Sequence, residues 1–141
     1  MKFWDTSAIV PLCVVEPATA KVRALTRADP SMVVWWATRT ECLSGFARMR
    51  RERKLPVATI ARAEQVLVAL AAEWSEVLPG EGLRERAERL LGIHSLRAAD
   101  AFQLAAALVW SRGETSFHAV VSLDERLRDA ASREGFRVMP T

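Results

Sequence analysis

Short apolar runs alternate with longer helical patterns along the whole chain, and this alternation limits the folds open to it. The runs are Lys2–Trp4, Val33–Trp36, Glu76–Leu78, Ala119–Ser122 and Arg137–Met139. Strands that alternate with helices are typical of βαβ units and a mostly parallel sheet. Short, mostly apolar strands are also what a sheet buried under helices on both faces requires. The sequence therefore predicts an α/β fold with a mostly parallel, short-stranded central sheet flanked by helices.

Helix signals fill the intervals between these runs. In the first half of the chain, the predicted helices are Ser7–Leu12 capped by Ser7, one opening at Glu16-Pro17, one from Thr38 or Thr40 to Arg53, and one opening at Pro56. In the second half they are Gly82–Ile93, Leu96–Ser111 capped by Ser95, and one that opens at Asp124 or its neighbour and is ended by Gly135. From Ala98 to Trp110 the pattern is apolar on almost every side, and Asp100 and Gln103 are its only polar residues. A helix of this kind is buried on most of its faces.

Length and composition favour a soluble protein with its own core. A chain of 141 residues is expected to form one domain, residues 1–141, and can bury a sizeable core. Half of its residues are hydrophobic, which excludes a disordered chain. The most apolar stretch, 104–110, is too short to cross a bilayer, and no leader-like segment opens the chain. We expect a cytoplasmic location.

The net charge of +3 and the pI of about 9.4 indicate a mild preference for acidic partners such as nucleic acid. Arginine carries most of the positive charge, and its side chain suits bidentate contacts with phosphate. An Ala- and Arg-rich, Lys-poor chain is equally what a GC-rich coding sequence produces. Charge alone therefore does not decide the partner.

Cysteine and histidine give no sign of a thiol or zinc centre. Cys13 and Cys42 are too few for a disulfide framework or a zinc cluster, and both lie in apolar helical contexts that favour buried free thiols. Neither His94 nor His118 has a second histidine or cysteine at ligand spacing. Zinc is therefore not expected.

Four acidic residues far apart in the chain lie where the predicted fold would bring them together. Asp5 and Asp124 each follow a predicted strand, and ligand sites in open α/β sheets lie at the carboxyl ends of the strands. Glu41 and Asp100 lie near the starts of predicted helices. Each acid also has a purely structural interpretation. Asp5 or Asp124 could cap a helix, and Glu41 could be a first-turn acid that interacts favourably with the helix dipole. Asp100 could form an ion pair with Arg97, three residues earlier.

A shared acidic cavity has a definite chemistry. Two like charges about 4 Å apart repel by roughly 4 kcal/mol at an effective dielectric constant of about 20, so four carboxylates need cations or protons to coexist. Mg²⁺ and Mn²⁺ prefer oxygen ligands, and Mg²⁺ retains several of its waters. Such ions activate water for attack on phosphodiesters, which requires no nucleophilic side chain.

These residues lie in segments that resemble the acidic motifs of the PIN-domain nucleases. In chain order the segments are Phe3–Ala8 with Asp5-Thr6-Ser7, Thr40-Glu41 with the helix after it, Leu96–Ala105 around Asp100, and Val121–Leu127 around Asp124. The closing segment 135–140 is similar to the family's final short strand. Any one of these motifs is weak, but four of them in register make the resemblance specific over the whole chain.

The resemblance implies a three-layer PIN-like fold and an Mg²⁺- or Mn²⁺-dependent endoribonuclease. A PIN domain of this length is similar to the toxin of a VapBC-type toxin–antitoxin pair, which implies a small antitoxin partner and commonly a homodimer. By position, Asp5, Glu41, Asp100 and Asp124 carry over as catalytic, metal-binding acids, and Ser7 and Ser122 as supporting hydrogen-bond partners. Ser122 departs mildly from the pattern, because threonine is more usual there.

Two surface features could contact RNA or a partner. Arg48, Arg50 and Arg51 end the helix that carries Glu41, where they could contact the RNA backbone or form a solvated helix end. Trp35 and Trp36 precede that helix, and an exposed tryptophan could stack on a base or anchor an antitoxin peptide. We expect at least one of the two to be in the core.

Other acidic-pocket proteins fit less well. A haloacid-dehalogenase-type phosphatase needs an aspartate where Ser7 stands, and a response-regulator receiver needs a lysine late in the chain, whereas the last lysine is Lys54. The alternative that stays open is a catalytically silent PIN-like scaffold that binds RNA or protein.

Overall fold

The computed structural model describes residues 1–141 and contains one five-stranded sheet. The strands are β1 (Lys2–Trp4), β2 (Met32–Trp35), β3 (Ser75–Val77), β4 (Ala119–Val121) and β5 (Arg137–Met139). Their order across the sheet is β3-β2-β1-β4-β5, and every neighbouring pair is parallel. All five strands start within one residue of the predicted runs. The predicted α/β fold with a parallel central sheet is therefore confirmed.

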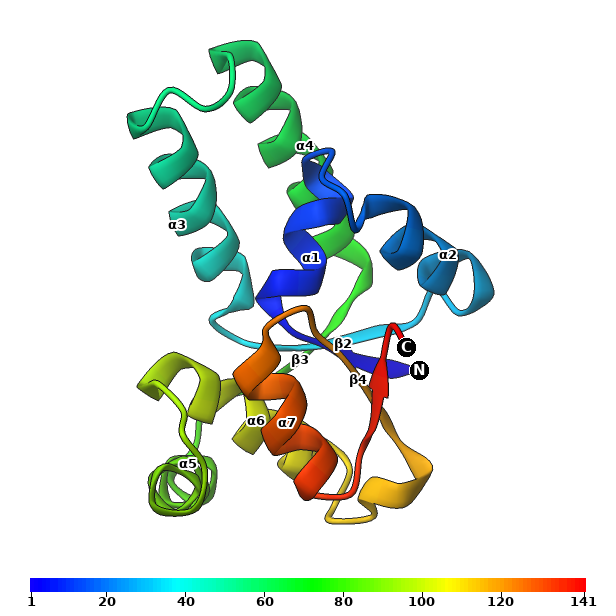
Figure 1. Ribbon diagram of the computed structural model, residues 1–141, viewed down its shortest axis with the longest axis vertical. Helices are drawn as coiled ribbons and strands as arrows, with labels where there is room; N and C mark the ends of the chain where they lie inside the picture. Colours follow the sequence, from blue (N-terminus) through cyan, green and yellow to red (C-terminus); the bar gives the residue numbers. More distant parts are fainter.

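Seven α-helices cover the two faces of this sheet, which makes three layers (Figure 1). They are α1 (Thr6–Cys13), α2 (Thr19–Ala28), α3 (Thr38–Arg51), α4 (Val57–Glu73), α5 (Glu81–Ile93), α6 (Ala98–Trp110) and α7 (Glu125–Arg133). Helices α1 to α4 lie on one side and α5 to α7 on the other (Figure 1). A short 3₁₀ helix, Thr115–Phe117, precedes β4. None of the helices combines the length and the apolar character that a membrane span requires.

Alternate residues of the three central strands, β2, β1 and β4, pack into two separate cores. Phe3 of β1 packs with the layer of α5 to α7, whereas its neighbour Trp4 packs with the layer of α1 to α4. This follows from the two-residue period of a strand, which directs successive side chains to opposite faces. Helix α6 is buried along most of its length, as its apolar pattern predicts.

Several helix ends differ from the predictions for simple reasons. Ser7 does not cap α1; Asp5 does, because its side chain accepts from the free amide of Ser7. Ser95 lies outside α6, because the extended residue Arg97 is its N-cap position. Helix α3 ends at Arg51 rather than Arg53, which adopts a left-handed conformation with φ of 52°. Such a residue ends a helix.

Gly135 ends α7 as predicted. It adopts φ of +94°, which glycine tolerates better than other residues. The amide of Phe136 donates to the carbonyl of Ala131, and that of Gly135 to the carbonyl of Ser132. This pair of bonds is the Schellman motif that turns the chain out of a helix. The turn directs the chain into β5 at the edge of the sheet.

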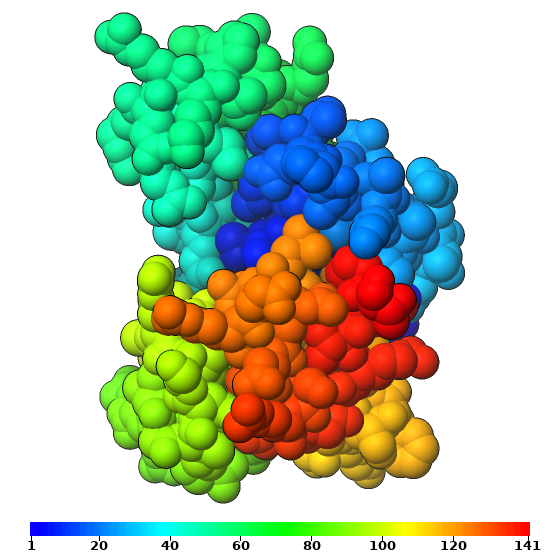
Figure 2. Space-filling view, viewed as in Figure 1, coloured from blue at the N-terminus to red at the C-terminus, as the bar shows by residue number.

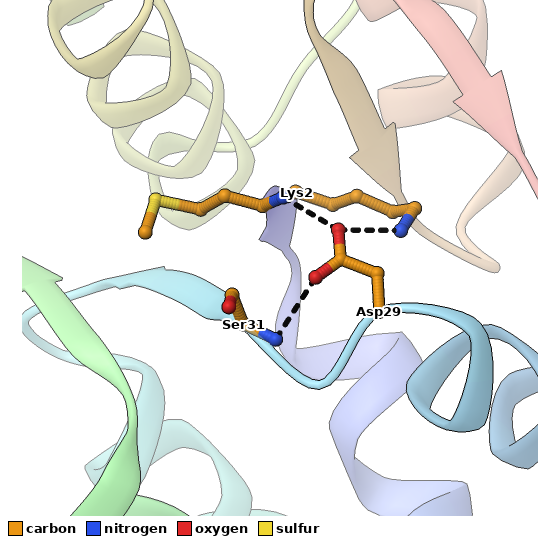
Figure 3. A network of polar contacts seen from close by, with 4 residues as sticks. Lys2, Asp29 and Ser31 are labelled. Atoms are coloured by element: carbon orange, nitrogen blue, oxygen red, sulfur yellow. Dashed lines mark hydrogen bonds and ion pairs between the residues drawn. The ribbon is translucent and has the colours of Figure 1, made fainter.

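A polar network fixes the amino-terminal edge of the sheet (Figure 3). Asp29 follows α2; its Oδ2 accepts from the terminal ammonium and, at 2.9 Å, from Lys2 Nζ. Its Oδ1 accepts from the amide of Ser31 at 3.1 Å. These donors hold the pKa of the Asp29 carboxyl well below its usual range. The network ties the start of β1 to the entry of β2, at the sheet edge opposite the strand ends that carry Asp5 and Asp124.

Candidate metal-binding active site

The four acids predicted from the sequence line one cleft. The cleft has a volume of about 540 Å³ and lies at the carboxyl ends of β1 and β4, bordered by α1 and α3. Figure 2 shows it as a hollow where the blue segment of α1, the teal segment of α3 and the orange segment after β4 meet. The acids are Asp5, Glu41, Asp100 and Asp124. The arrangement follows from the parallel sheet, which places the ends of its strands at one edge.

Asp5 is the most buried of these acids. It directly follows β1, and only 4% of its surface is exposed. Its Oδ2 accepts hydrogen bonds from the Ser7 hydroxyl, from the Ser122 hydroxyl at 2.9 Å and from the Ser7 amide at 3.2 Å. Because all three donors converge on one oxygen, the orientation of the carboxylate is fixed.

The same two serines join the loop after β1 to the loop after β4. The Ser7 hydroxyl accepts from the Leu123 amide at 2.8 Å, and the Ser122 hydroxyl accepts from the Asp124 amide at 3.2 Å. Asp124 in turn caps α7 by accepting from the Leu127 amide at 2.9 Å. The capping interpretations of Asp5 and Asp124 are therefore correct, and both residues still line the cleft.

Glu41 lies in the first turn of α3 and is held by two donors. Its Oε2 accepts from the Thr6 hydroxyl at 2.8 Å and from the Gln103 amide nitrogen at 3.2 Å. Neither Thr6 nor Gln103 is among the site residues expected from the sequence. The available signal for Gln103 was its position: an uncharged polar residue in an otherwise apolar helix, three residues after Asp100.

Asp100 lies in the first turn of α6 and is half-buried. It forms no ion pair with Arg97, which is exposed, so the ion-pair interpretation is wrong. No lysine, arginine or histidine forms an ion pair with any of the four acids. The negative charge of the cleft is therefore not neutralised by direct contacts with cationic side chains.

Electrostatics couples the acids to one another. Burial raises the pKa of Asp5 from its usual 3.8 to about 6, against the opposing effect of the hydrogen bonds from Ser7 and Ser122. Burial also raises the pKa of Glu41, and the charge of Asp100 adds to the rise. The pKa of Asp100 is raised by burial and then by the charge of Asp124. Each shift disfavours the ionised form, which a bound cation would favour.

The donor atoms of the cleft suit a hard divalent cation. No three histidine, cysteine or acidic side chains stand close enough to hold a metal ion by themselves. Mg²⁺ needs only one or two carboxylates, because it keeps several waters. Carboxylate and hydroxyl oxygens supply such ligands, and neither histidine nor cysteine lines the cleft. The chemistry therefore fits Mg²⁺ or Mn²⁺ and does not fit a zinc site.

The histidines and cysteines lie elsewhere. His94 contacts Glu134 at 2.7 Å, and His118 Nδ1 lies 2.8 Å from the carbonyl oxygen of Glu114. Cys13 and Cys42 are free thiols; Cys42 is buried and Cys13 is partly exposed. Burial raises the pKa of the Cys13 thiol to about 12. Such a thiol stays protonated near neutral pH and is a poor nucleophile.

The predicted surface features divide between cleft, surface and core. Arg48 lines the cleft, whereas Arg50 and Arg51 lie farther along α3; all three side chains are exposed. Trp35 is buried and stacks on Phe102 with ring centroids 5.7 Å apart. Trp36 is 53% exposed. The expectation that at least one of the pair is in the core is confirmed.

Comparison with known proteins identifies the family. The pattern of the PIN domain matches residues 2–133, which is nearly the whole chain. The chain belongs to the PIN domain family. PIN domains are in general nucleases and generally use divalent metals, which supports hydrolysis of nucleic acid by this chain. The matched range spans the positions of all four acids. No curated protein sequence matches the chain significantly.

Solved structures share the same PIN fold. A toxin–antitoxin complex from Klebsiella pneumoniae is 16% identical, with a TM-score of 0.67, 99% of this chain covered and 97% of that one. FitAcB from Neisseria gonorrhoeae is 19% identical, with a TM-score of 0.67 and the same coverage. PAE2754 from Pyrobaculum aerophilum is 17% identical, with a TM-score of 0.65, 97% of this chain covered and 82% of that one. At these identities the likeness establishes the fold.

Proposed function

We propose that this PIN domain is an Mg²⁺- or Mn²⁺-dependent endoribonuclease. The observation that carries the proposal is the single cleft lined by Asp5, Glu41, Asp100 and Asp124, in which no cationic side chain pairs with the acids. A bound divalent cation would supply an activated water and stabilise the charge that develops on the phosphoryl oxygens. The protein ligands of this cation would come from the four acids.

The chain's own residues prepare this site in three ways. Ser7 and Ser122 orient the Asp5 carboxylate, and Thr6 orients that of Glu41. The buried position of Asp5 lowers the local dielectric constant, which strengthens its attraction for a cation. Arg48 at the mouth of the cleft, with Arg50 and Arg51, offers bidentate contacts to the phosphates that flank the bond to be cut.

We also propose that the chain acts in the cytoplasm as the toxin of a VapBC-type pair, with a small antitoxin as its partner and a homodimer as its assembly. The fold supports this role, because the structurally similar Klebsiella pneumoniae protein was solved as a toxin–antitoxin complex. An inhibitory partner is also reasonable on physical grounds, since the cleft is open to solvent and no segment of the chain covers it (Figure 2).

The test is cleavage of total cellular RNA by purified protein freed of any partner. Reactions contain Mn²⁺ or EDTA, and Asp100→Asn is assayed beside the wild type, with circular dichroism to show that both are folded. Discrete fragments that require both the metal and Asp100 support the proposal, and mapping of their ends identifies the cleaved site. Folded protein that gives no metal-dependent fragments would instead support the catalytically silent scaffold.

A further inference from the structure

Gln103 is a buried polar side chain that reaches across the molecule to the acidic cleft. It belongs to α6, on the side of the sheet opposite α1 and α3, and only 1% of its surface is exposed. Its amide nitrogen lies 3.0 Å from the Thr6 hydroxyl, 3.1 Å from the Thr38 hydroxyl and 3.2 Å from Glu41 Oε2. One side chain thus joins α6 to both α1 and α3.

The nitrogen and the oxygen of the Gln103 side-chain amide differ in their hydrogen-bond partners. Its nitrogen has three acceptors within hydrogen-bond distance, whereas its buried oxygen has no partner. Rotating the amide would place the oxygen against the Glu41 carboxylate, where two acceptors would repel each other. The carboxylate therefore fixes the direction of the amide, although one buried acceptor is left without a hydrogen bond. Such an acceptor lowers stability, and the hydrogen bonds of the amide nitrogen to Thr6, Thr38 and Glu41 oppose this cost.

The donors divide the oxygens of Glu41 into two kinds. Thr6 and Gln103 both donate to Oε2, and Gln103 also donates to the Thr6 hydroxyl that faces Oε2. Oε1 accepts no hydrogen bond from the protein. One oxygen is therefore anchored, and the other is left free for a ligand. Hydrogen-bond partners of this kind orient the groups that coordinate a metal.

We infer that Gln103 is a positioning residue for the metal site: with Thr6, it anchors Oε2 of Glu41 and thereby presents Oε1 to the divalent cation. This inference rests on the proposed function, because it takes the cleft to be the metal site. Gln103 also lies three residues after Asp100 in α6, so its bond to Glu41 links the helix that carries Asp100 to the helix that carries Glu41.

The experiment measures the affinity of metal-free protein for Mn²⁺, with the free ion followed by electron paramagnetic resonance. The test variant is Gln103→Met, which keeps the length of the side chain and removes the donor. Ser111→Ala is the matched control, because it removes a buried hydroxyl that bonds only to a backbone carbonyl at the far end of the same helix. Glu41→Gln reports whether the cleft is the metal site. Thermal melts establish that every protein is folded at the temperature used.

We expect Gln103→Met to weaken Mn²⁺ binding about tenfold or more, and Ser111→Ala to bind as the wild type does. Thr6→Val removes the other donor to Oε2; it should weaken binding in the same direction, and it serves as the test variant if Gln103→Met does not fold. Wild-type affinity in Gln103→Met, together with weak binding in Glu41→Gln, would overturn the inference and leave the proposed function intact. Undiminished binding in Glu41→Gln would overturn both.

Discussion

Replacement of Asp5 by asparagine should stabilise the metal-free protein. Asp5 is almost completely buried, and its pKa is raised from 3.8 to about 6. At roughly 1.4 kcal/mol for each pH unit of difference, ionisation of this group costs the folded state about 3 kcal/mol near pH 7. Asparagine has no charge to bury, and its side-chain oxygen can still accept from Ser7 and Ser122. Because the hydrogen bonds to the asparagine oxygen are weaker than those to the carboxylate, we expect the free energy of unfolding to rise by about 2 kcal/mol.

The dependence on pH follows from the direction of the shift. A carboxyl group whose pKa is raised on folding binds its proton more tightly in the folded state, so its stabilising effect is present below pH 3.8 and is lost as the pH rises through about 6. The stability difference between Asp5→Asn and the wild type should therefore be small near pH 4, grow between pH 4 and 6, and stay constant above about pH 7.

The assay is thermal unfolding in EDTA across this range of pH. A gain of 2 kcal/mol corresponds to a rise in Tm of about 4–8 °C for a chain of this size. With added Mn²⁺ the wild type should have the higher Tm of the two, because the bound ion stabilises its folded state. Asp29→Asn is a control with the opposite sign: its pKa is lowered by the terminal ammonium and Lys2, so the variant loses stability near neutral pH. An unchanged or lower Tm for Asp5→Asn at pH 7 without metal would refute the reasoning.

Three further variants probe the cleft and its surroundings. Ser122→Ala removes a hydrogen-bond donor to Asp5 and an acceptor for the Asp124 amide. The rate of RNA cleavage should therefore fall about 10- to 100-fold with the fold intact. An unchanged rate would show that Ser122 does not orient the site. Replacing Arg48, Arg50 and Arg51 by alanine should weaken RNA binding in filter-binding measurements. The slope of the logarithm of the binding constant against the logarithm of salt concentration should become shallower by up to about 0.7 for each lost phosphate contact. An unchanged slope would place the RNA elsewhere. In urea titrations, replacing the buried Trp35 by alanine should lower the free energy of unfolding by about 3–5 kcal/mol. Replacing the exposed Trp36 by alanine should lower it by less than about 1 kcal/mol. Similar losses in the two variants would contradict the assignment of Trp35 to the core and Trp36 to the surface.

The sequence was sufficient to predict the sheet and the convergence of the acids because both depend on local patterns. Short apolar runs bounded by helix signals located all five strands, and a parallel sheet necessarily places its strand ends at one edge. Asp5 and Asp124 follow such ends, so their meeting in one cleft needed no knowledge of side-chain packing. The structural interpretations were not true alternatives, since both residues cap helices and line the cleft at once.

The sequence could not predict features that depend on how the layers pack. Gln103 was visible as an isolated polar residue, but its reach across the sheet edge to Glu41 follows from the relative positions of α3 and α6. Which of Trp35 and Trp36 enters the core depends on where β2 ends: both faces of this strand are buried, Trp35 is its last residue, and Trp36 lies just beyond it. The start of α6 was misplaced because Ser95 is a good capping residue that lies outside the helix.

The position of bound Mn²⁺ in the crystal is the most direct test of the claim that the four acids form one metal site. Anomalous diffraction from crystals of the wild type grown with Mn²⁺ locates the ion without reference to activity. The account predicts an anomalous peak inside the cleft, at roughly 2.1 Å from an oxygen of one or two of the four carboxylates, and a weaker peak or none in Asp5→Asn and Asp100→Asn. A peak outside the cleft, or an equal peak in the variants, would contradict it.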